Sequence, residues 1–340
     1  MKKIFILTLT ILTLISILLT GCNTDSLLDY KKAAEKTDGI IRGQTSAEFT
    51  TTTELNTEGM TDEEIKELNY YKDIKGSFNS VFDSELKKEI YKIYLNSGGL
   101  GFDFDLYING NEIFMKLPVI GKYLNLNDVV IESTMNVNEG KILITDESVA
   151  AIGAKWLGLL KKDDVFKGKD IVLTTPDGEV KTTEYTINLN NEQIKNLFVD
   201  VIDIVYTDQN LKSFYTEFIE TKIKENADSM QDVEIENISY EEMLDNMKEN
   251  IDFYNVEKFN YTAHVDIDGY IVNETIELLI KVDNAKQKSL SGFNFKLDIS
   301  NWDINKSQEF NYPTLTEENT LKMEEKESMP DVMQDIFIKE

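Results

Sequence analysis

GLGFDFDLYINGNEIFMKL, residues 99–117, predicts an antiparallel β-hairpin with one apolar face. From Leu100 to Ile108, apolar side chains alternate with Gly101, Asp103, Asp105 and Tyr107, which is the two-residue period of a half-buried strand. Asn109-Gly110 is one of the strongest hairpin turn signals, and residues 112–117 are expected to form the second strand of the hairpin. We therefore expect one face of this sheet to be buried and the other, including Tyr107, to face water.

Further strands are expected on both sides of this hairpin. Pro176-Asp177-Gly178 is a second strong turn signal and predicts a hairpin over residues 171–189. Asp268-Gly269 predicts a third turn. The remaining segments rich in β-branched and aromatic residues are 38–55, 76–83, 88–95, one or two short strands within 123–136, 259–267, 270–282, 292–299 and 309–315.

Helices are expected at the start and in the middle of the chain. Residues 27–36 read as a short helix, and Thr61 with Glu64 forms a capping box that begins a helix ending near residue 71. An amphipathic helix is expected at 148–162, and three apolar stripes predict helices between 191 and 251, with an acidic loop at 225–236. Because no strand–helix–strand alternation is present, the pattern predicts the α+β class with an antiparallel sheet. Such a sheet curves, and the mid-chain helices can cover its concave face.

The amino-terminal segment resembles a bacterial lipoprotein signal with its lipobox. Lys2 and Lys3 precede an apolar run over residues 4–19, and Thr20-Gly21 leads into Cys22, the only cysteine. The resemblance implies that residues 1–21 are removed and that the Cys22 thiol receives a lipid. Residues 22–26 would be a short tether on the extracytoplasmic face of the cell membrane. The alternatives are an uncleaved anchor and a lone buried cysteine.

Composition excludes several classes of partner. The formal net charge is −27, and Arg42 is the only arginine, so the surface repels nucleic acid, whose binding requires clustered Lys and Arg. A single cysteine permits no internal disulfide. Residues 27–315 are expected to form one domain, and 316–340 an acidic tail.

The residues that carry chemistry are sparse, and we predict no enzymatic activity, metal or cofactor. His264 is the only histidine, so no His-pair metal site is available. A Ser/His/Asp hydrolase would have to use His264, and no Gly-x-Ser-x-Gly motif precedes a helix. Asp266 to Gly269 does not fit a calcium loop, because Thr275 stands where an acid is required. Asp103 and Asp105 have the spacing of solvent-facing strand residues.

The body of the chain resembles the LolA/LppX type of lipoprotein and lipid-carrier domain. The features that carry this likeness are the lipobox, the helix and long strand over 27–55, the aromatic meander over 76–117, the hairpin at 176–178, the helices after 191 and the closing strands to 315. The resemblance implies a half-open β-barrel roofed by helices that holds or moves a lipid. No residue motif within it is diagnostic, so it assigns no individual binding residue.

A set of apolar side chains is expected to line a ligand cavity or, alternatively, to pack a filled core. The candidates are Leu100, Phe102, Phe104, Leu106, Trp156, Phe198, Phe214 and Phe218. With a cavity, the chain is a membrane-anchored, non-enzymatic carrier or binder of a lipid or other lipophile. With a filled core, it is an envelope module that binds another protein. The space between the sheet and the helices at 148–162 and 191–222 distinguishes the two.

Overall fold

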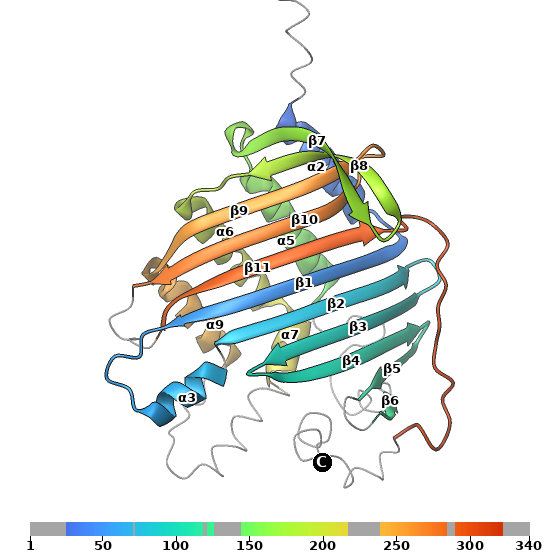
Figure 1. Cartoon of the computed structure of the whole chain (residues 1–340), viewed down its shortest axis with the longest axis horizontal. Helices are drawn as coiled ribbons and strands as arrows, with labels where there is room; N and C mark the ends of the chain where they lie inside the picture. Colours follow the sequence, from blue (N-terminus) through green and yellow to red (C-terminus); the bar gives the residue numbers. More distant parts are fainter. Residues whose placement is uncertain are drawn as a thin grey trace, which may run out of the picture.

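In the computed structural model, which describes residues 25–70, 72–117, 121–125, 144–216, 239–283 and 290–321, the strands form one open antiparallel sheet (Figure 1). Within those residues the sheet has eleven strands in the order β6-β5-β4-β3-β2-β1-β11-β10-β9-β8-β7. Their bounds are β1 Arg42–Leu55, β2 Asp73–Asp83, β3 Lys88–Ser97, β4 Leu100–Asn109, β5 Glu112–Lys116, β6 Tyr123–Asn125, β7 Val165–Thr175, β8 Gly178–Ile187, β9 Tyr254–Asp266, β10 Ile271–Val282 and β11 Leu290–Trp302.

Two meanders are joined at the centre of the sheet. The first meander is formed by β1 to β6, which lie next to one another in chain order, and the second is formed by β7 to β11 in the same way. The first strand then pairs antiparallel with the last, with Ala47 opposite Ile299. This pairing places the two ends of the domain side by side, while β6 and β7 remain as its edges.

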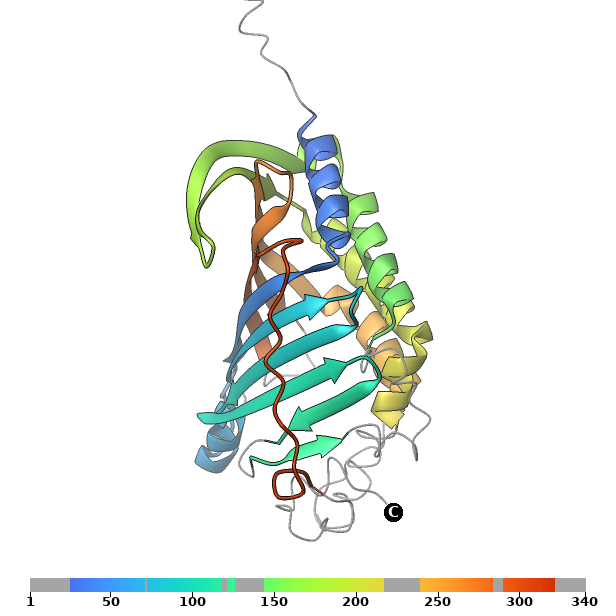
Figure 2. The same cartoon turned by 90° about the vertical axis from the view of Figure 1, so that its right-hand side faces the viewer.

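Helices cover the concave face of the sheet (Figure 2). α2, α5, α6 and α9 lie across this face, whereas α3 lies beyond the ends of the strands that it connects. The described helices are α2 Ser26–Asp38, α3 Asp62–Tyr70, α5 Asp146–Leu159, α6 Asn191–Thr207, α7 Gln209–Phe214 and α9 Tyr240–Glu249, with the 3-10 turns η2 Lys162–Asp164 and η4 Ile251–Phe253. Among the described residues, no helix combines the length and apolar character that a membrane crossing requires. The arrangement confirms the predicted α+β fold, a curved antiparallel sheet with helices on its concave face.

The register divides the sheet into an apolar and a polar face. One row of directly opposed residues runs across the concave face and contains Ala263, Glu274, Ile299, Ala47, Phe78, Ile93 and Phe104. The adjacent row, on the convex face, contains Thr262, Thr275, Asp298, Glu48, Ser77, Tyr94 and Asp103. The helices therefore cover the apolar face.

The most deeply buried core lies between β8, β9 and α2. Ile187 and Ala263 are fully buried, and Tyr30 of α2 is 1% exposed against them. Full burial of such side chains contributes roughly 1.5–3 kcal/mol each, so this contact is a main attachment of α2 to the sheet.

The predicted strand at 309–315 is wrong. Residues 303–315 instead run past the ends of the strands of the N-terminal meander, where they cannot form a ladder (Figures 1 and 2). The Tyr312 hydroxyl donates to the Ile108 carbonyl at 2.6 Å, and Phe310 and Tyr312 pack beside Tyr107. This packing buries Tyr107, which we expected to face water.

Several predicted features lie outside the described residues. These are the signal segment and Cys22, strand residues 126–136, the acidic loop at 225–236 and tail residues 322–340.

Candidate functional site

A cavity of about 620 Å³ lies between α2, α5 and the concave face of the sheet. Its sheet side includes Phe82, Ile271 and Ile299, from β2, β10 and β11. α5 faces it with small residues, Ala150, Gly153 and Ala154. Gly153 is exposed, and a Cβ added there would meet nothing within 4 Å, so the cavity is open on this side of α5.

A chain of hydrogen bonds leads from α5 through α2 to the sheet. The indole N–H of Trp156 donates to the Tyr30 hydroxyl at 3.0 Å, and that hydroxyl donates to Tyr261 on β9 at 2.8 Å. The Tyr261 hydroxyl in turn donates to the Oε1 atom of Glu274 on β10. Edge-on packing of Tyr30 and Tyr261, with ring centroids 5.9 Å apart, holds the two hydroxyls in place. The chain therefore ends on a carboxyl group that lines the cavity.

Burial sets the protonation of this chain. It raises the pKa of the Glu274 carboxyl above its ordinary value, although the hydrogen bond from Tyr261 acts in the opposite direction. Burial also raises the pKa values of Tyr30 and Tyr261, so both phenols are neutral donors at physiological pH.

α5 is held at its N-terminus by Asp208, which lies between α6 and α7 and is 3% exposed. One carboxylate oxygen accepts from the Thr145 backbone N–H at 3.0 Å and from the Thr145 hydroxyl at 2.8 Å. The other oxygen accepts from the Leu211 N–H at 3.0 Å and so caps α7. Asp208 therefore fixes the position of α5 over the sheet.

Of the predicted lining residues, Trp156 lines this cavity. Leu100, Phe102, Phe104 and Leu106 lie on β4, three strands from β1, and do not line it. Phe102 and Phe104 are half-buried on the same face of the sheet, whereas Leu100 is 62% exposed at the start of the strand.

Phe198, on α6, is exposed and also lies away from the cavity. Phe214 belongs to α7, but its side chain is not among those that the structure describes. Phe218 lies outside the described residues. Contact of these eight candidate residues with a ligand stays a prediction.

Glu274 was missed by the sequence prediction, although a signal was present. In residues 271–282, Glu274 has the same two-residue phase as Ile276 and Leu278, which pair with Tyr261 and Phe259 on the covered face. An acid in the apolar phase of a strand points to a buried carboxyl that needs a partner.

The polar residues considered for catalysis lie on the opposite face of the sheet. His264 pairs with Asn273, its Nδ1 atom lying 3.1 Å from the amide oxygen, and Asp105 lies 3.8 Å from the Lys116 ammonium. Asp103 and Asp105 share the convex face by register. Within the described residues, no group of three His, Cys, Asp or Glu side chains is placed to hold a metal ion.

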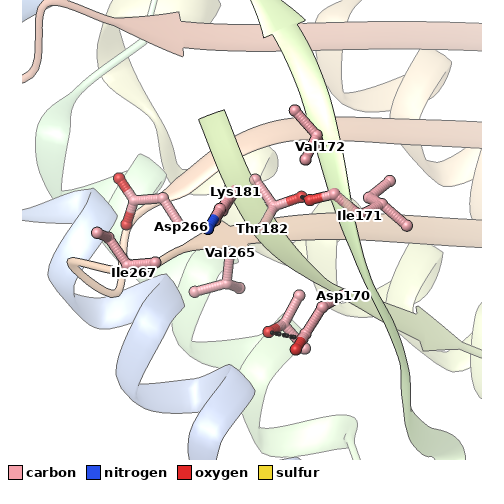
Figure 3. Close-up of a pocket in the computed structure, with 9 residues that line it drawn as sticks. Asp170, Ile171, Val172, Lys181, Thr182, Val265, Asp266 and Ile267 are labelled. Carbon is pink, nitrogen blue, oxygen red and sulfur yellow. Dashed lines mark hydrogen bonds between the residues drawn. The ribbon is translucent and has the colours of Figure 1, made fainter. Parts of the chain in front are cut away.

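A second pocket, of about 400 Å³, lies beside the β7–β8 hairpin (Figure 3). Its lining mixes Ile171, Val172 and Val265 with Asp170, Lys181 and Asp266. The hydroxyl of Thr183 already donates to Asp170 at 2.8 Å. This pocket is smaller than the cavity between α2, α5 and the sheet, and no helix among the described residues contributes to its lining.

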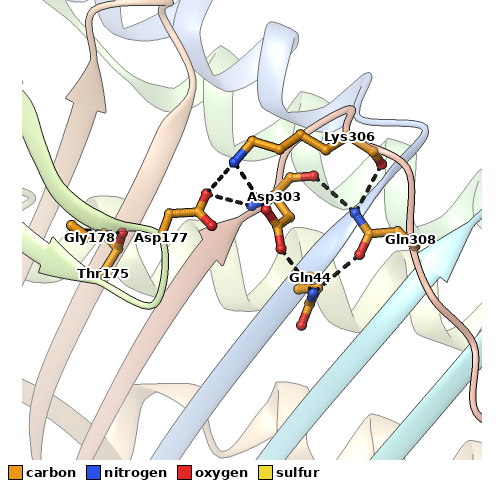
Figure 4. A network of polar contacts seen from close by, with 7 residues as sticks. All are labelled: Gln44, Thr175, Asp177, Gly178, Asp303, Lys306 and Gln308. Atoms are coloured by element: carbon orange, nitrogen blue, oxygen red, sulfur yellow. Dashed lines mark hydrogen bonds and ion pairs between the residues drawn. The ribbon is translucent and has the colours of Figure 1, made fainter.

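The tip of the same hairpin is attached to the end of β11 (Figure 4). Asp177 accepts from the Asp303 backbone N–H and from the Lys306 ammonium, each at 3.0 Å. Burial opposes ionisation of Asp177, but these hydrogen bonds prevail and lower its pKa. Gln44 of β1 joins the network through Asp303 and Gln308. We therefore regard this cluster as a structural attachment of the edge hairpin.

Comparison with known proteins gives structural neighbours only. The sequence matches no protein-family model and no curated protein. A DUF1329 family protein from Desulfovibrio piger aligns over 82% of this chain and 94% of its own, with 9% identity and a TM-score of 0.21. The LolA superfamily protein NE2245 from Nitrosomonas europaea aligns over 80% of this chain and 90% of its own, with 7% identity and a TM-score of 0.20.

A β-barrel-like protein of the DUF1849 domain from Brucella abortus aligns over 78% of this chain and all of its own, with 10% identity and a TM-score of 0.17. TM-scores this low assign no function to the chain.

Proposed function

We propose that this protein binds and carries a lipid or another lipophilic small molecule in the cavity between α2, α5 and the sheet. The observation that carries the proposal is the cavity itself, about 620 Å³ with apolar side chains on its floor. Pockets for small molecules commonly measure about 300–1,000 Å³ and are lined mainly by apolar groups with a few polar ones. The alternative, a protein-interaction module with a filled core, leaves the small residues of α5 and the space beneath them unexplained.

Blocking the cavity tests the proposal. Gly153→Trp places an indole where a Cβ would meet nothing within 4 Å, on the cavity side of α5. We expect this variant to bind a neutral fluorescent apolar probe, such as N-phenyl-1-naphthylamine, about tenfold or more weakly than the unmodified protein, because the added ring occupies the probe's space.

Gly158→Trp is the matched control. Gly158 lies on the same helix, an added Cβ there also meets nothing within 4 Å, and it does not line the cavity. Both substitutions raise helix propensity alike. Equal probe binding by the two variants, or no binding by the unmodified protein, contradicts a carrier role for this cavity.

The membrane anchor is a separate part of the proposal. α2 begins at Ser26, four residues after Cys22, so a lipid on that cysteine would hold the start of α2 close to the bilayer. We expect mass spectrometry of protein from its own host to find an N-terminal diacylglyceryl-cysteine at position 22. An unmodified Cys22 within an uncleaved chain would exclude the lipid anchor without bearing on the cavity.

A further inference from the structure

Glu274 is a polar residue of the cavity lining whose hydrogen bonding within the protein is incomplete. Oε1 of Glu274 accepts from Tyr261, but in the part of the chain that the structure describes no hydrogen bond or ion pair reaches Oε2. Glu274 lines the cavity, and burial disfavours its charged form. Glu274 is half-buried, and a carboxyl oxygen there without a protein partner is a position at which a polar group of a ligand can bind.

The neighbouring polar side chains bond to one another and to the backbone, and none of these bonds reaches Oε2 of Glu274. The Thr37 hydroxyl donates to the Ala33 carbonyl and accepts from the Ile271 N–H, both at 2.8 Å. Thr45 donates to the Asn301 amide oxygen at 2.9 Å, and the Asn301 amide nitrogen donates to the Ile271 carbonyl at 3.1 Å. Oε2 is therefore free to accept a donor from a ligand.

The hydroxyls next to Glu274 cannot supply a second donor either. Each hydrogen of the Trp156, Tyr30 and Tyr261 chain points along the chain toward Oε1. The donors of this chain end at Oε1, so none of them reaches Oε2.

The charge of the lining favours a cation. Glu35 and Asp38 lie at the exposed α2 side of the cavity, and no Lys, Arg or His is among the described residues that line it. Two basic residues of these helices, Lys36 on α2 and Lys155 on α5, bind groups outside the cavity. Lys36 donates to the Asp268 carbonyl and lies over the Tyr270 ring, and Lys155 pairs with Asp200 at 2.7 Å. An anionic head group would meet only like charge here.

We propose that the ligand is a cationic amphiphile, an apolar chain that ends in a protonated amine, with its ammonium group against Oε2 of Glu274 and its chain along Phe82, Ile271 and Ile299. This inference rests on the proposed carrier function and specifies the class of cargo. An ammonium supplies both the missing donor and the compensating charge, whereas a hydroxyl supplies only the donor.

Three ligands of equal chain length test the proposal. Dodecylamine, dodecanol and dodecanoate are titrated at pH 7, below their aggregation concentrations, with displacement of the neutral probe as the readout. The amine is protonated at this pH, as a lysine side chain is. We expect dodecylamine to bind about tenfold more tightly than dodecanol, and dodecanoate to bind most weakly.

Glu274→Gln should reduce the affinity for dodecylamine to that for dodecanol, because the shape is kept and the charge is lost. Glu277→Gln is the matched control. It removes one charge from the same strand on the convex face, where Glu277 pairs with Lys258 at 2.6 Å, and should leave the preference intact. If Glu274→Gln does not fold, Glu274→Asp, which withdraws the carboxylate by one methylene, takes its place.

Equal binding of amine and alcohol by the unmodified protein overturns the inference but leaves the carrier function standing. The inference is also overturned, with the carrier function still standing, if the preference for dodecylamine survives in Glu274→Gln. The same holds if Glu277→Gln abolishes that preference as fully as Glu274→Gln does. Failure of all three compounds and of the neutral probe to bind overturns the carrier function itself.

Discussion

Tyr30→Ala is expected to lower the free energy of unfolding by about 3–5 kcal/mol, the usual cost of deleting a buried aromatic ring. The Tyr30 ring is 1% exposed and packs against Tyr185 and Tyr261, and it is a main attachment of α2 to the sheet. Its removal leaves a void and takes away the hydrogen-bond partner of both Trp156 and Tyr261. Denaturation in urea, followed by circular dichroism, measures the change.

Tyr30→Phe separates the ring from the hydroxyl. The phenylalanine keeps the packing but leaves the Trp156 N–H without its acceptor, so we expect a loss of about 1–3 kcal/mol. Hydrogen exchange of the α2 amides should increase strongly in Tyr30→Ala and only slightly in Tyr30→Phe. A cost below about 1.5 kcal/mol for Tyr30→Ala would mean that α2 is not held to the sheet by this residue.

Local signals predicted most of the strands and helices. The turns at Asn109-Gly110 and Pro176-Asp177-Gly178 are where the sequence placed them, because turn chemistry and two-residue alternation depend on adjacent residues. The helix expected at 148–162 is α5, Asp146–Leu159, and it lies on the predicted face of the sheet. These features require no knowledge of distant contacts.

Local sequence signals could not predict which strands pair across long stretches of the chain. The antiparallel pairing of β1 with β11 joins residues about 250 positions apart, and nothing in either strand alone specifies the other as partner. The error at 309–315 has the same origin. The segment has the composition of a strand, with Phe310 and Tyr312, but both sides of every nearby central strand are already paired, so it crosses the strand ends.

The sequence predicted a space between the helices and the sheet, but of the expected lining residues that the structure describes, only Trp156 lies at the cavity. Amphipathic helices over a curved sheet predicted a space between them, and Trp156 is one of the residues that line the cavity there. The sequence could not show which strands α5 would cover, because the position of a helix across a sheet is set by tertiary contacts such as Tyr30 with Tyr261 and Asp208 with Thr145. The aromatic residues of β4 were therefore expected at a site that lies over β1, β2, β10 and β11 instead.

Asp208→Ala is expected to lower the free energy of unfolding at pH 7 by about 2–4 kcal/mol. The substitution removes the cap of α7 and leaves the Thr145 and Leu211 N–H groups without an acceptor in a buried position. It should also loosen α5 over the cavity. Asp200→Ala is the matched control, because its carboxylate pairs with Lys155 at the surface, where such a pair contributes about 1 kcal/mol or less.

The effect of Asp208 should also depend on pH in a definite direction. Burial opposes ionisation, but hydrogen bonds from Ser148, Leu211 and Thr145 outweigh it and lower the pKa of Asp208. A carboxyl whose pKa is lower in the folded state stabilises the fold fully above its unfolded pKa, about 4, and loses that contribution as the pH falls through its folded pKa. The stability difference between the unmodified protein and Asp208→Asn should therefore be largest near neutral pH and shrink below pH 4. A difference that stays constant between pH 7 and pH 3 would show that the charge of Asp208 does not contribute, and that capping alone holds α5 and α7 in place.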